Sequence, residues 1–372
     1  MNILLLLAHS IAEYDDLRML TDMGHDVFSI GAYTDPRHPG DDKRPALPQA
    51  PWHPELAALV PDQMAAKEHV PAELLEWADA VIVHHYLDRW VHGQWSRLRP
   101  GPRRPRIIWR TCGQSDFRLE ELMRPLVAEG LEVVRYSPAE RRFFEPAGQL
   151  AGQHALIPFA KYLADYPAWE PDLEQPYVAN VTQNMAGRGE WCGYGWYMAA
   201  TEGLPARPAG PGSEQLPGGL GALEYSAMLE YLRRASAYVY TGTVPASYTL
   251  GLLEAMLVGV PVVSLSGQAW MGPAALWQGD ELAGWSATAP GEARAILAQL
   301  LEDPFAPAHL EPMLRQREGT QAFWVQDVAL QWDELLLGRH RCACPDRQRG
   351  QLHRRECPYA TLGLRSILGG QN

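Results

Sequence analysis

Residues 240–266, YTGTVPASYTLGLLEAMLVGVPVVSLS, contain the residue types best suited to chemistry in this chain. Their hydrophobic pattern predicts a strand, a polar loop, a helix and a second buried strand in immediate succession. A loop that enters a helix leaves backbone N–H groups unpaired at the positive end of the helix dipole, which favours a diphosphate. Ser247, Tyr248, Thr249 and Leu250 fall at this turn. They are the predicted residues of a diphosphate site.

The same stretch resembles the donor-site signature of the retaining glycosyltransferases related to glycogen and sucrose synthases, P-S-x-x-E-x-F-G-L-x-x-L-E-A-M-A-x-G-x-P-V-V. The matching residues are Pro245, Leu253, Glu254, Ala255, Met256, Gly259, Pro261, Val262 and Val263. The resemblance implies the GT-B fold, in which two Rossmann-like domains face a cleft. It also implies transfer of a sugar from a nucleoside diphosphate to a hydroxyl acceptor, with retention. In these enzymes the carboxylate at the position of Glu254 accepts hydrogen bonds from the ribose hydroxyls.

One acidic residue of the signature is missing. The family has another glutamate near the transferred sugar, eight positions before the ribose-binding one, and Ala246 stands there in this chain. In a retaining reaction the leaving phosphate takes the acceptor's proton on the same face, so the protein supplies position and charge stabilisation. If the alanine marks a change to inversion, His9 or Asp116 is the first candidate for the base. Sugar specificity and stereochemistry stay open.

The resemblance also implies a basic residue after the first strand of the second domain, where it meets the donor's phosphates. In the loop NVTQNMAGRGEW the basic residue is Arg188. Its planar and permanently charged guanidinium suits that role. Asn184 in the same loop is a second candidate. The alternative for Arg188 is an ordinary solvated loop residue.

Polar residues also follow several strands predicted in the first half. His9 follows NILLLLA, His84 follows ADAVIV, and Gln114, Ser115 and Asp116 follow PRIIWRT. The carboxyl ends of parallel strands meet at one edge of the sheet, where such domains open their crevice. His9, His84 and Asp116 are therefore candidate catalytic residues, and Gln114 and Ser115 are candidates for the acceptor side. The alternative for each of them is an ordinary polar loop residue.

The elements that must position these residues come in two series. Strand-like and helix-like segments alternate along residues 1–160 and again along 177–338, which predicts right-handed crossovers and two parallel sheets in an α/β protein. Residues 161–176 are rich in proline and aromatic residues and form the predicted connection. We expect the first domain to bind the acceptor and the second to bind the donor nucleotide.

The C-terminal segment, residues 339–372, forms a separate module in this interpretation. Cys342, Cys344, His353 and Cys357 suit a closed structural zinc site, since three thiolates and an imidazole leave no open position for catalysis. Reduced free cysteines are the alternative. The segment also carries seven arginines against two acidic residues, a composition that suits a polyanion. No cofactor is expected for catalysis itself.

Composition narrows the class of protein further. The chain of 372 residues is 47% hydrophobic and 20% charged, as expected for a folded globular protein. Its net charge of -12 argues against non-specific nucleic-acid binding by the whole surface. The opening MNILLLLA is far shorter than the roughly 18 apolar residues of a membrane helix, so we expect a buried strand, no integral membrane contact and a cytoplasmic protein.

Three other functions remain open from the sequence. The arginine-rich tail permits a DNA glycosyltransferase of the phage DNA-modification type, acting on hydroxymethylated bases, by analogy at the level of the fold. A sugar-nucleotide epimerase shares the architecture. An inactive nucleotide-sugar binding protein would explain the loss at Ala246. The sequence does not determine the base or sugar of the donor, or the oligomeric state. It also leaves open whether the acceptor is a saccharide, a lipid, a small molecule or DNA.

Overall fold

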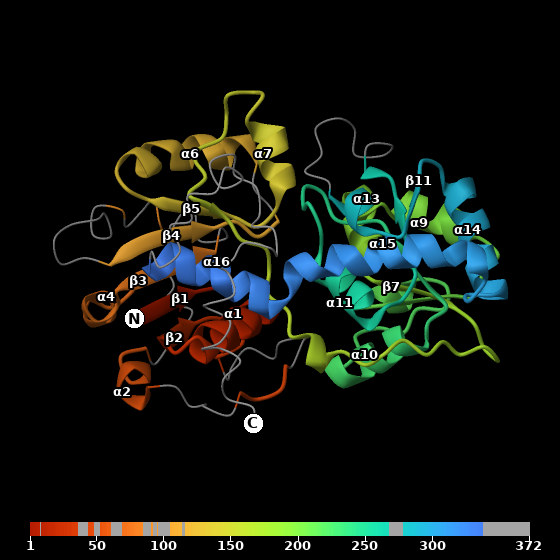
Figure 1. Cartoon of the computed structure of the whole chain (residues 1–372), viewed down its shortest axis with the longest axis horizontal. Coiled ribbons are helices and arrows are strands. Elements are labelled where there is room, and N and C mark those ends of the chain that lie inside the picture. The colour runs from red at the N-terminus through yellow and green to blue at the C-terminus, as the bar shows by residue number, and fades with distance from the viewer. Residues whose placement is uncertain are drawn as a thin grey trace, which may run out of the picture.

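The computed structural model of the chain places two α/β domains side by side (Figure 1). The residues that it describes are 1–7, 9–35, 44–47, 53–60, 69–84, 91, 95, 105–113, 116–267 and 278–337. Every strand pairing within the two sheets is parallel. The predicted α/β class with two Rossmann-like domains is confirmed.

The first sheet has six strands. In spatial order they are β2 (Asp26–Ile30), β1 (Asn2–Leu6), β3 (Ala80–His84), β4 (Arg106–Arg110), β5 (Glu132–Arg135) and β6 (Ala155–Leu156). Alternate residues of β1 enter different apolar clusters, Ile3 and Leu5 on one face and Leu4 and Leu6 on the other. Both faces of the sheet are therefore covered, which explains the uninterrupted apolar run at the N-terminus.

Helices cover these faces. Those of the first domain are α1 (Ser10–Asp22), α2 (Pro54–Ala57), α4 (Ala72–Trp77), α6 (Phe117–Ala128) and α7 (Pro138–Phe144). Helix α6 begins after Asp116, whose Oδ1 accepts a hydrogen bond from the N–H of Leu119 at 2.7 Å. Ser137 caps α7 in the same way through the N–H of Ala139. Polar caps thus set where these helices leave the cleft edge of the sheet.

The second sheet has five strands. In spatial order they are β11 (Trp285–Ala287), β10 (Val262–Leu265), β9 (Ala237–Tyr240), β7 (Val178–Val181) and β8 (Ala206–Ala209). The helices around it are α8 (Met185–Arg188), α9 (Tyr194–Thr201), α10 (Tyr225–Arg234), α11 (Leu250–Val258), α13 (Gly279–Leu282), α14 (Pro290–Glu302) and α15 (Leu310–Thr320). The order β9, α11, β10 confirms the strand, helix and strand predicted within residues 240–266.

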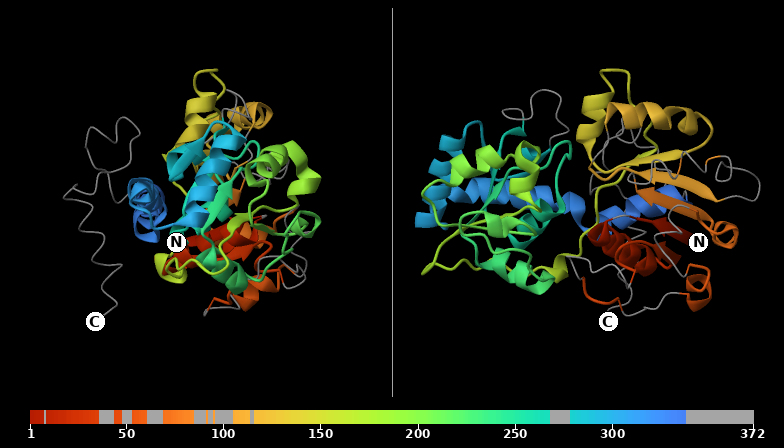
Figure 2. Two further views of the ribbon diagram at one scale, coloured as in Figure 1. Left: turned by 90° about the vertical axis from the view of Figure 1, so that its right-hand side faces the viewer. Right: turned by 180° about the vertical axis from the view of Figure 1, so that it is seen from behind.

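The chain returns to the first domain after α15. Lys161, in the predicted connection, pairs with this return segment through its N–H to the Phe323 carbonyl at 2.7 Å and its carbonyl to the Val325 N–H at 2.9 Å. Helix α16 (Val325–Leu337), blue in Figure 2, then lies against the first domain. Its last turn accepts two hydrogen bonds from Arg106. The predicted domain boundaries stay predictions. None of the helices in the described ranges is long and apolar enough to cross a bilayer.

Candidate functional site

The carboxyl ends of the two sheets meet between the domains. Tyr136, just after β5, accepts a hydrogen bond on its hydroxyl oxygen from the N–H of Ser247 at 2.7 Å. Tyr248 donates its own hydroxyl to the Tyr136 carbonyl at 3.0 Å, and the two rings lie 4.9 Å apart. All three residues are buried. The loop that leads into α11 is thus held against the first domain by direct contacts.

Ala246 lies inside this contact. A Cβ atom built on Gly113, in the first domain, would lie 3.3 Å from the Cβ of Ala246. Gly113 has φ +95°, a conformation that favours glycine, so the approach of the two loops depends on small residues on both sides. The residue that replaces the family's glutamate is only 8% exposed. The missing carboxylate therefore coincides with close packing between the domains.

The N-terminus of α11 keeps only part of its predicted donors. The Ser247 N–H is taken by Tyr136, and the Thr249 N–H donates to the Tyr240 hydroxyl at 3.1 Å. Thr249 is the N-cap, and its Oγ1 accepts from the Leu252 N–H at 3.3 Å. The first helical residue, Leu250, retains an N–H of the kind that a helix start leaves without an intrahelical acceptor. An anion at this turn would meet Leu250 and the residue after it.

The predicted phosphate loop lies beside this turn. Asn184 is the residue before α8, with φ 47°, and Arg188 is the last residue of that helix. The next segment is tied to the α11 loop, because the Val244 N–H donates to the carbonyl of Trp191 at 2.7 Å. Arg188 makes no ion pair with any residue in the described part of the chain. Its role in binding phosphate stays a prediction.

Glu254 is not exposed to solvent in this structure. Its Oε1 pairs with Nη2 of Arg44, which comes from the first domain, and both side chains are almost fully buried. Nζ of Lys161 lies 3.9 Å from the same oxygen and 2.6 Å from Oδ2 of Asp15. Sequence reasoning missed these partners, because no periodicity relates Arg44 to a residue 210 positions away.

His9 lies close to this charged cluster. It precedes α1, and its Nδ1 is buried with no hydrogen-bond partner among the described residues. Burial lowers the pKa of His9 to about 4, and the charges of His84, Lys161 and Arg44 lower it as well. The ring is therefore neutral at pH 7 and offers a hydrogen-bonding nitrogen that the described protein groups do not use.

The other predicted catalytic residues are engaged elsewhere. His84 is fully buried, and its Nε2 lies 3.2 Å from Oδ2 of Asp16, which also pairs with Arg110. Burial also lowers the pKa of His84. Asp116 uses one carboxylate oxygen to cap α6. The structure thus brings His9 and His84 near each other and gives Asp116 a local structural contact.

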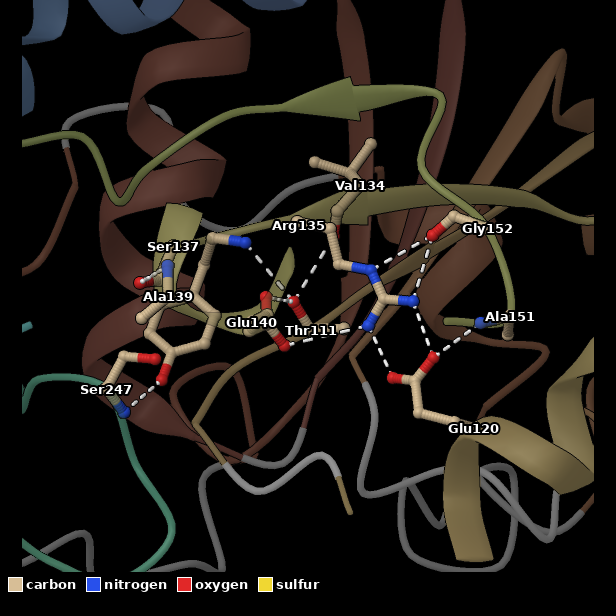
Figure 3. Close-up of polar contacts among 11 residues, drawn as sticks. Thr111, Glu120, Val134, Arg135, Ser137, Ala139, Glu140, Ala151, Gly152 and Ser247 are labelled. Carbon is tan, nitrogen blue, oxygen red and sulfur yellow. Dashed lines mark hydrogen bonds and ion pairs between the residues drawn. The ribbon is translucent and has the colours of Figure 1, made fainter. Parts of the chain in front are cut away.

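A buried network of ion pairs and hydrogen bonds in the first domain connects to Tyr136 (Figure 3). Arg135 pairs with both oxygens of Glu120 at 2.5 and 2.6 Å, and lies 3.8 Å from Glu140. Thr111 donates its hydroxyl to Oε2 of Glu140 at 2.7 Å and accepts the Tyr136 N–H at 3.2 Å. Burial raises the pKa of Glu140 to about 7. No pattern in the sequence singled out this glutamate.

Two groups of predicted site residues fall outside the part of the chain that the structure describes. They are Gln114 and Ser115 on the acceptor side, and Cys342, Cys344, His353 and Cys357 of the zinc site. Within the ranges that are described, no group of three or more His, Cys, Asp or Glu side chains could hold a metal ion. The zinc site and the tail's binding of a polyanion therefore stay predictions.

Solved structures share this architecture. Sucrose-phosphate synthase from Thermosynechococcus elongatus matches with a TM-score of 0.62 and 17% identity, over 91% of this chain and 98% of that one. A glycosyltransferase from Rickettsia africae gives 0.57 and 10%, over 91% and 99%. HepE from Anabaena, in complex with UDP, gives 0.55 and 16%, over 91% and 100%. No protein-family model and no curated protein sequence matches the chain. At these identities the likeness shows the GT-B fold.

Proposed function

We propose that this protein is a glycosyltransferase that moves a sugar from a nucleoside diphosphate to a hydroxyl acceptor. The observation that carries the proposal is the position of the signature helix α11: its N-terminus and Glu254 lie at the interface between two Rossmann-like domains. The similar GT-B structures support it, since they include a sucrose-phosphate synthase and a protein bound to UDP.

The nucleotide end of the proposed site uses three groups. The diphosphate accepts hydrogen bonds from the N–H groups at the start of α11, at Leu250, where the helix dipole is positive. Arg188 supplies the positive charge, because it lies in the segment joined to the α11 loop and pairs with no described acid. Glu254, one turn into the helix, accepts the ribose hydroxyls. Asn184 lies in the same loop as Arg188 and completes the phosphate side.

The sugar end departs from the resembled enzymes. Ala246 offers no carboxylate to the sugar, and it is buried where the loop before α11 approaches Gly113 of the first domain. His9 Nδ1 is buried with no partner among the described residues, and Ser247 Oγ is buried close to the Tyr136 hydroxyl. In this proposal these two atoms take over polar contacts to the transferred sugar. The reaction then proceeds with retention, and the leaving phosphate accepts the proton of the acceptor hydroxyl.

The first test is binding of UDP, GDP, ADP, CDP and TDP, measured as thermal stabilisation, because a ligand of the folded state raises its apparent stability. One nucleotide should stabilise the protein, and Glu254→Gln should weaken its binding about tenfold through loss of a charged acceptor. Glu281→Gln, an exposed acid of α13 that pairs with Arg142, is the matched control. No stabilisation by any of the five, either in the wild-type protein or in a variant that lacks the Arg44 partner of Glu254, would refute the proposal.

Turnover then separates the transferase from its alternatives. With the matching nucleotide sugar, free nucleoside diphosphate should appear only after a hydroxyl acceptor is added. Release of the nucleoside diphosphate without any dependence on an acceptor would favour an epimerase or hydrolase. Binding of the nucleotide sugar without turnover would favour a binding protein, if saccharide, lipid, small-molecule and hydroxymethylated DNA acceptors all fail to react. The DNA acceptor depends on the arginine-rich tail, so a chain ending at residue 337 should lose activity on DNA alone.

A further inference from the structure

A buried ion pair crosses the cleft at the residue on which the proposed nucleotide site depends. Arg44 of the first domain pairs with Oε1 of Glu254 in the second, and their side chains are 2% and 3% exposed. The guanidinium carbon also lies 3.8 Å from the ring centroid of Tyr225, at the start of α10. Arg44 is therefore held by a carboxylate and by an aromatic face of the same domain.

This pairing occupies the atom that a ribose would use. A carboxylate that binds a ribose diol must present its oxygens to two hydroxyl groups, whereas Oε1 of Glu254 is taken by Arg44 and approached by Lys161 at 3.9 Å. The almost complete burial of Glu254 leaves no room beside the guanidinium for a sugar ring. Arg44 and a ribose therefore exclude each other at this carboxylate.

We propose that Arg44 competes with the donor nucleotide for Glu254 and so sets the donor affinity of the protein. The inference rests on the proposed function, because it assumes that Glu254 accepts the ribose. A donor binds only after Arg44 has left the carboxylate. The observed association constant of the donor is therefore the intrinsic constant multiplied by the fraction of molecules in which Arg44 is released. The ion pair also joins the domains, so release of Arg44 loosens them as the donor binds.

Space for the displaced side chain lies next to the pair. A cavity of about 500 Å³ is bounded by Pro45 and Leu47, by Tyr14 of α1, by Asp165 of the connection and by Tyr225. Tyr225 is the same ring on which the guanidinium lies. The cavity therefore lies beside the displaced side chain, with Tyr225 and Pro45 between the ion pair and the open space. Asp165, although already paired with Arg18, adds a carboxylate at that wall.

The charge of Lys161 beside Glu254 makes it possible to replace Arg44 without leaving the buried carboxylate alone. Nζ of Lys161 lies 3.9 Å from Oε1 of Glu254, so we expect the carboxylate to keep a cationic neighbour in the buried site when Arg44 is replaced. Arg44→Gln removes the charge and retains a side chain that can fill the space. Arg44→Lys retains the charge but lacks the planar fork that pairs with a carboxylate while lying on a ring. Arg44→Gln should therefore abolish the competition between residue 44 and the ribose for Glu254, and Arg44→Lys should weaken it.

The experiment is titration calorimetry with UDP and the other four nucleoside diphosphates on the full-length chain. The nucleotide that binds wild-type protein should bind Arg44→Gln at least about tenfold more tightly and Arg44→Lys by an intermediate factor, as removal of a competing state predicts. The matched control is Arg142→Gln, which removes an exposed ion pair between α7 and α13 and should leave the affinity unchanged.

The outcomes separate this inference from the proposed function. If wild-type protein binds a nucleotide and Arg44→Gln binds it equally or more weakly, the competition is refuted while the nucleotide site stands. Binding by Arg44→Gln alone would support the competition in its strongest form. If neither protein binds any of the five nucleotides, both proposals fall. Should Arg44→Gln not fold, as judged by circular dichroism, Arg44→Lys decides by the same criterion.

Discussion

The hydroxyl oxygen of Tyr136 accepts the backbone N–H of Ser247 at 2.7 Å, across the boundary between the two domains. Because the N–H belongs to the loop that leads into α11, this hydrogen bond determines where the helix N-terminus lies relative to the first sheet. It also withdraws one N–H from any bound phosphate.

Tyr136→Phe should destabilise the protein by about 1–3 kcal/mol, since it leaves a buried N–H without an acceptor while keeping the ring. Chemical denaturation followed by circular dichroism would measure the loss. Tyr162→Phe is the control, because its hydroxyl donates to Oδ2 of Asp22 at an exposed position and its loss should cost far less. Equal effects of the two substitutions would contradict the importance of the contact between domains.

Ala246→Glu, which introduces the residue of the resembled family, should not raise the activity of the protein. Ala246 is only 8% exposed, and a Cβ on Gly113 would lie 3.3 Å from its own Cβ, so a longer charged side chain has to be buried in a closely packed contact between the domains. We expect a loss of about 2 kcal/mol or more in the free energy of unfolding, from overpacking and burial of a charge. Ala246→Ser, which adds one atom, serves as control. A stable and more active glutamate variant would show that the cleft opens here.

Glu140 should make the folded protein less stable as the pH rises. Burial raises its pKa from 4.5 to about 7, so between these values the unfolded chain has lost a proton that the folded protein keeps. Stability from this group is therefore greatest below pH 4.5, declines up to about pH 7 and stays low above it. Glu140→Gln should gain up to about 3 kcal/mol over wild type at pH 8 and almost nothing at pH 4. Unfolding curves at both pH values test this.

His9 should change the stability of the folded protein with pH in the opposite direction. Burial and nearby positive charges lower its pKa from 6.5 to about 4, so below pH 6.5 the unfolded chain binds a proton that the folded protein rejects. Stability is therefore lost as the pH falls from 6.5 to 4. His9→Gln should be more stable than wild type by up to about 3 kcal/mol at pH 4 but not at pH 8. Parallel titration curves for the two proteins would contradict the buried neutral imidazole.

Arg188→Ala should weaken binding of the nucleoside diphosphate about tenfold, the effect of one charged hydrogen bond. Binding of the corresponding nucleoside, which has no phosphates, should not change. Calorimetry with both ligands separates a phosphate contact from a general loss of folding. Arg294→Ala, which removes an exposed pair with Glu202 on the same domain, is the control.

Local signals in the sequence were sufficient for the architecture. Apolar runs such as NILLL predict strands covered on both faces, and the turn before Leu250 with Gly259 after the helix predicts the bounds of α11. Gly259 indeed has φ 99°, the left-handed conformation that ends a helix. These features depend on residues a few positions apart, so they can be read from the order of the chain.

The sequence by itself determined the two parallel-sheet domains, the helix that carries Glu254 and the absence of a glutamate at position 246. Only the tertiary structure decided that Arg44 occupies Glu254, that Ala246 packs on Gly113, and that Glu140 and His9 have shifted pKa values. The physical reason is that ion pairing, close packing and desolvation depend on which distant segments meet. Partners 210 residues apart leave no periodic trace in the sequence.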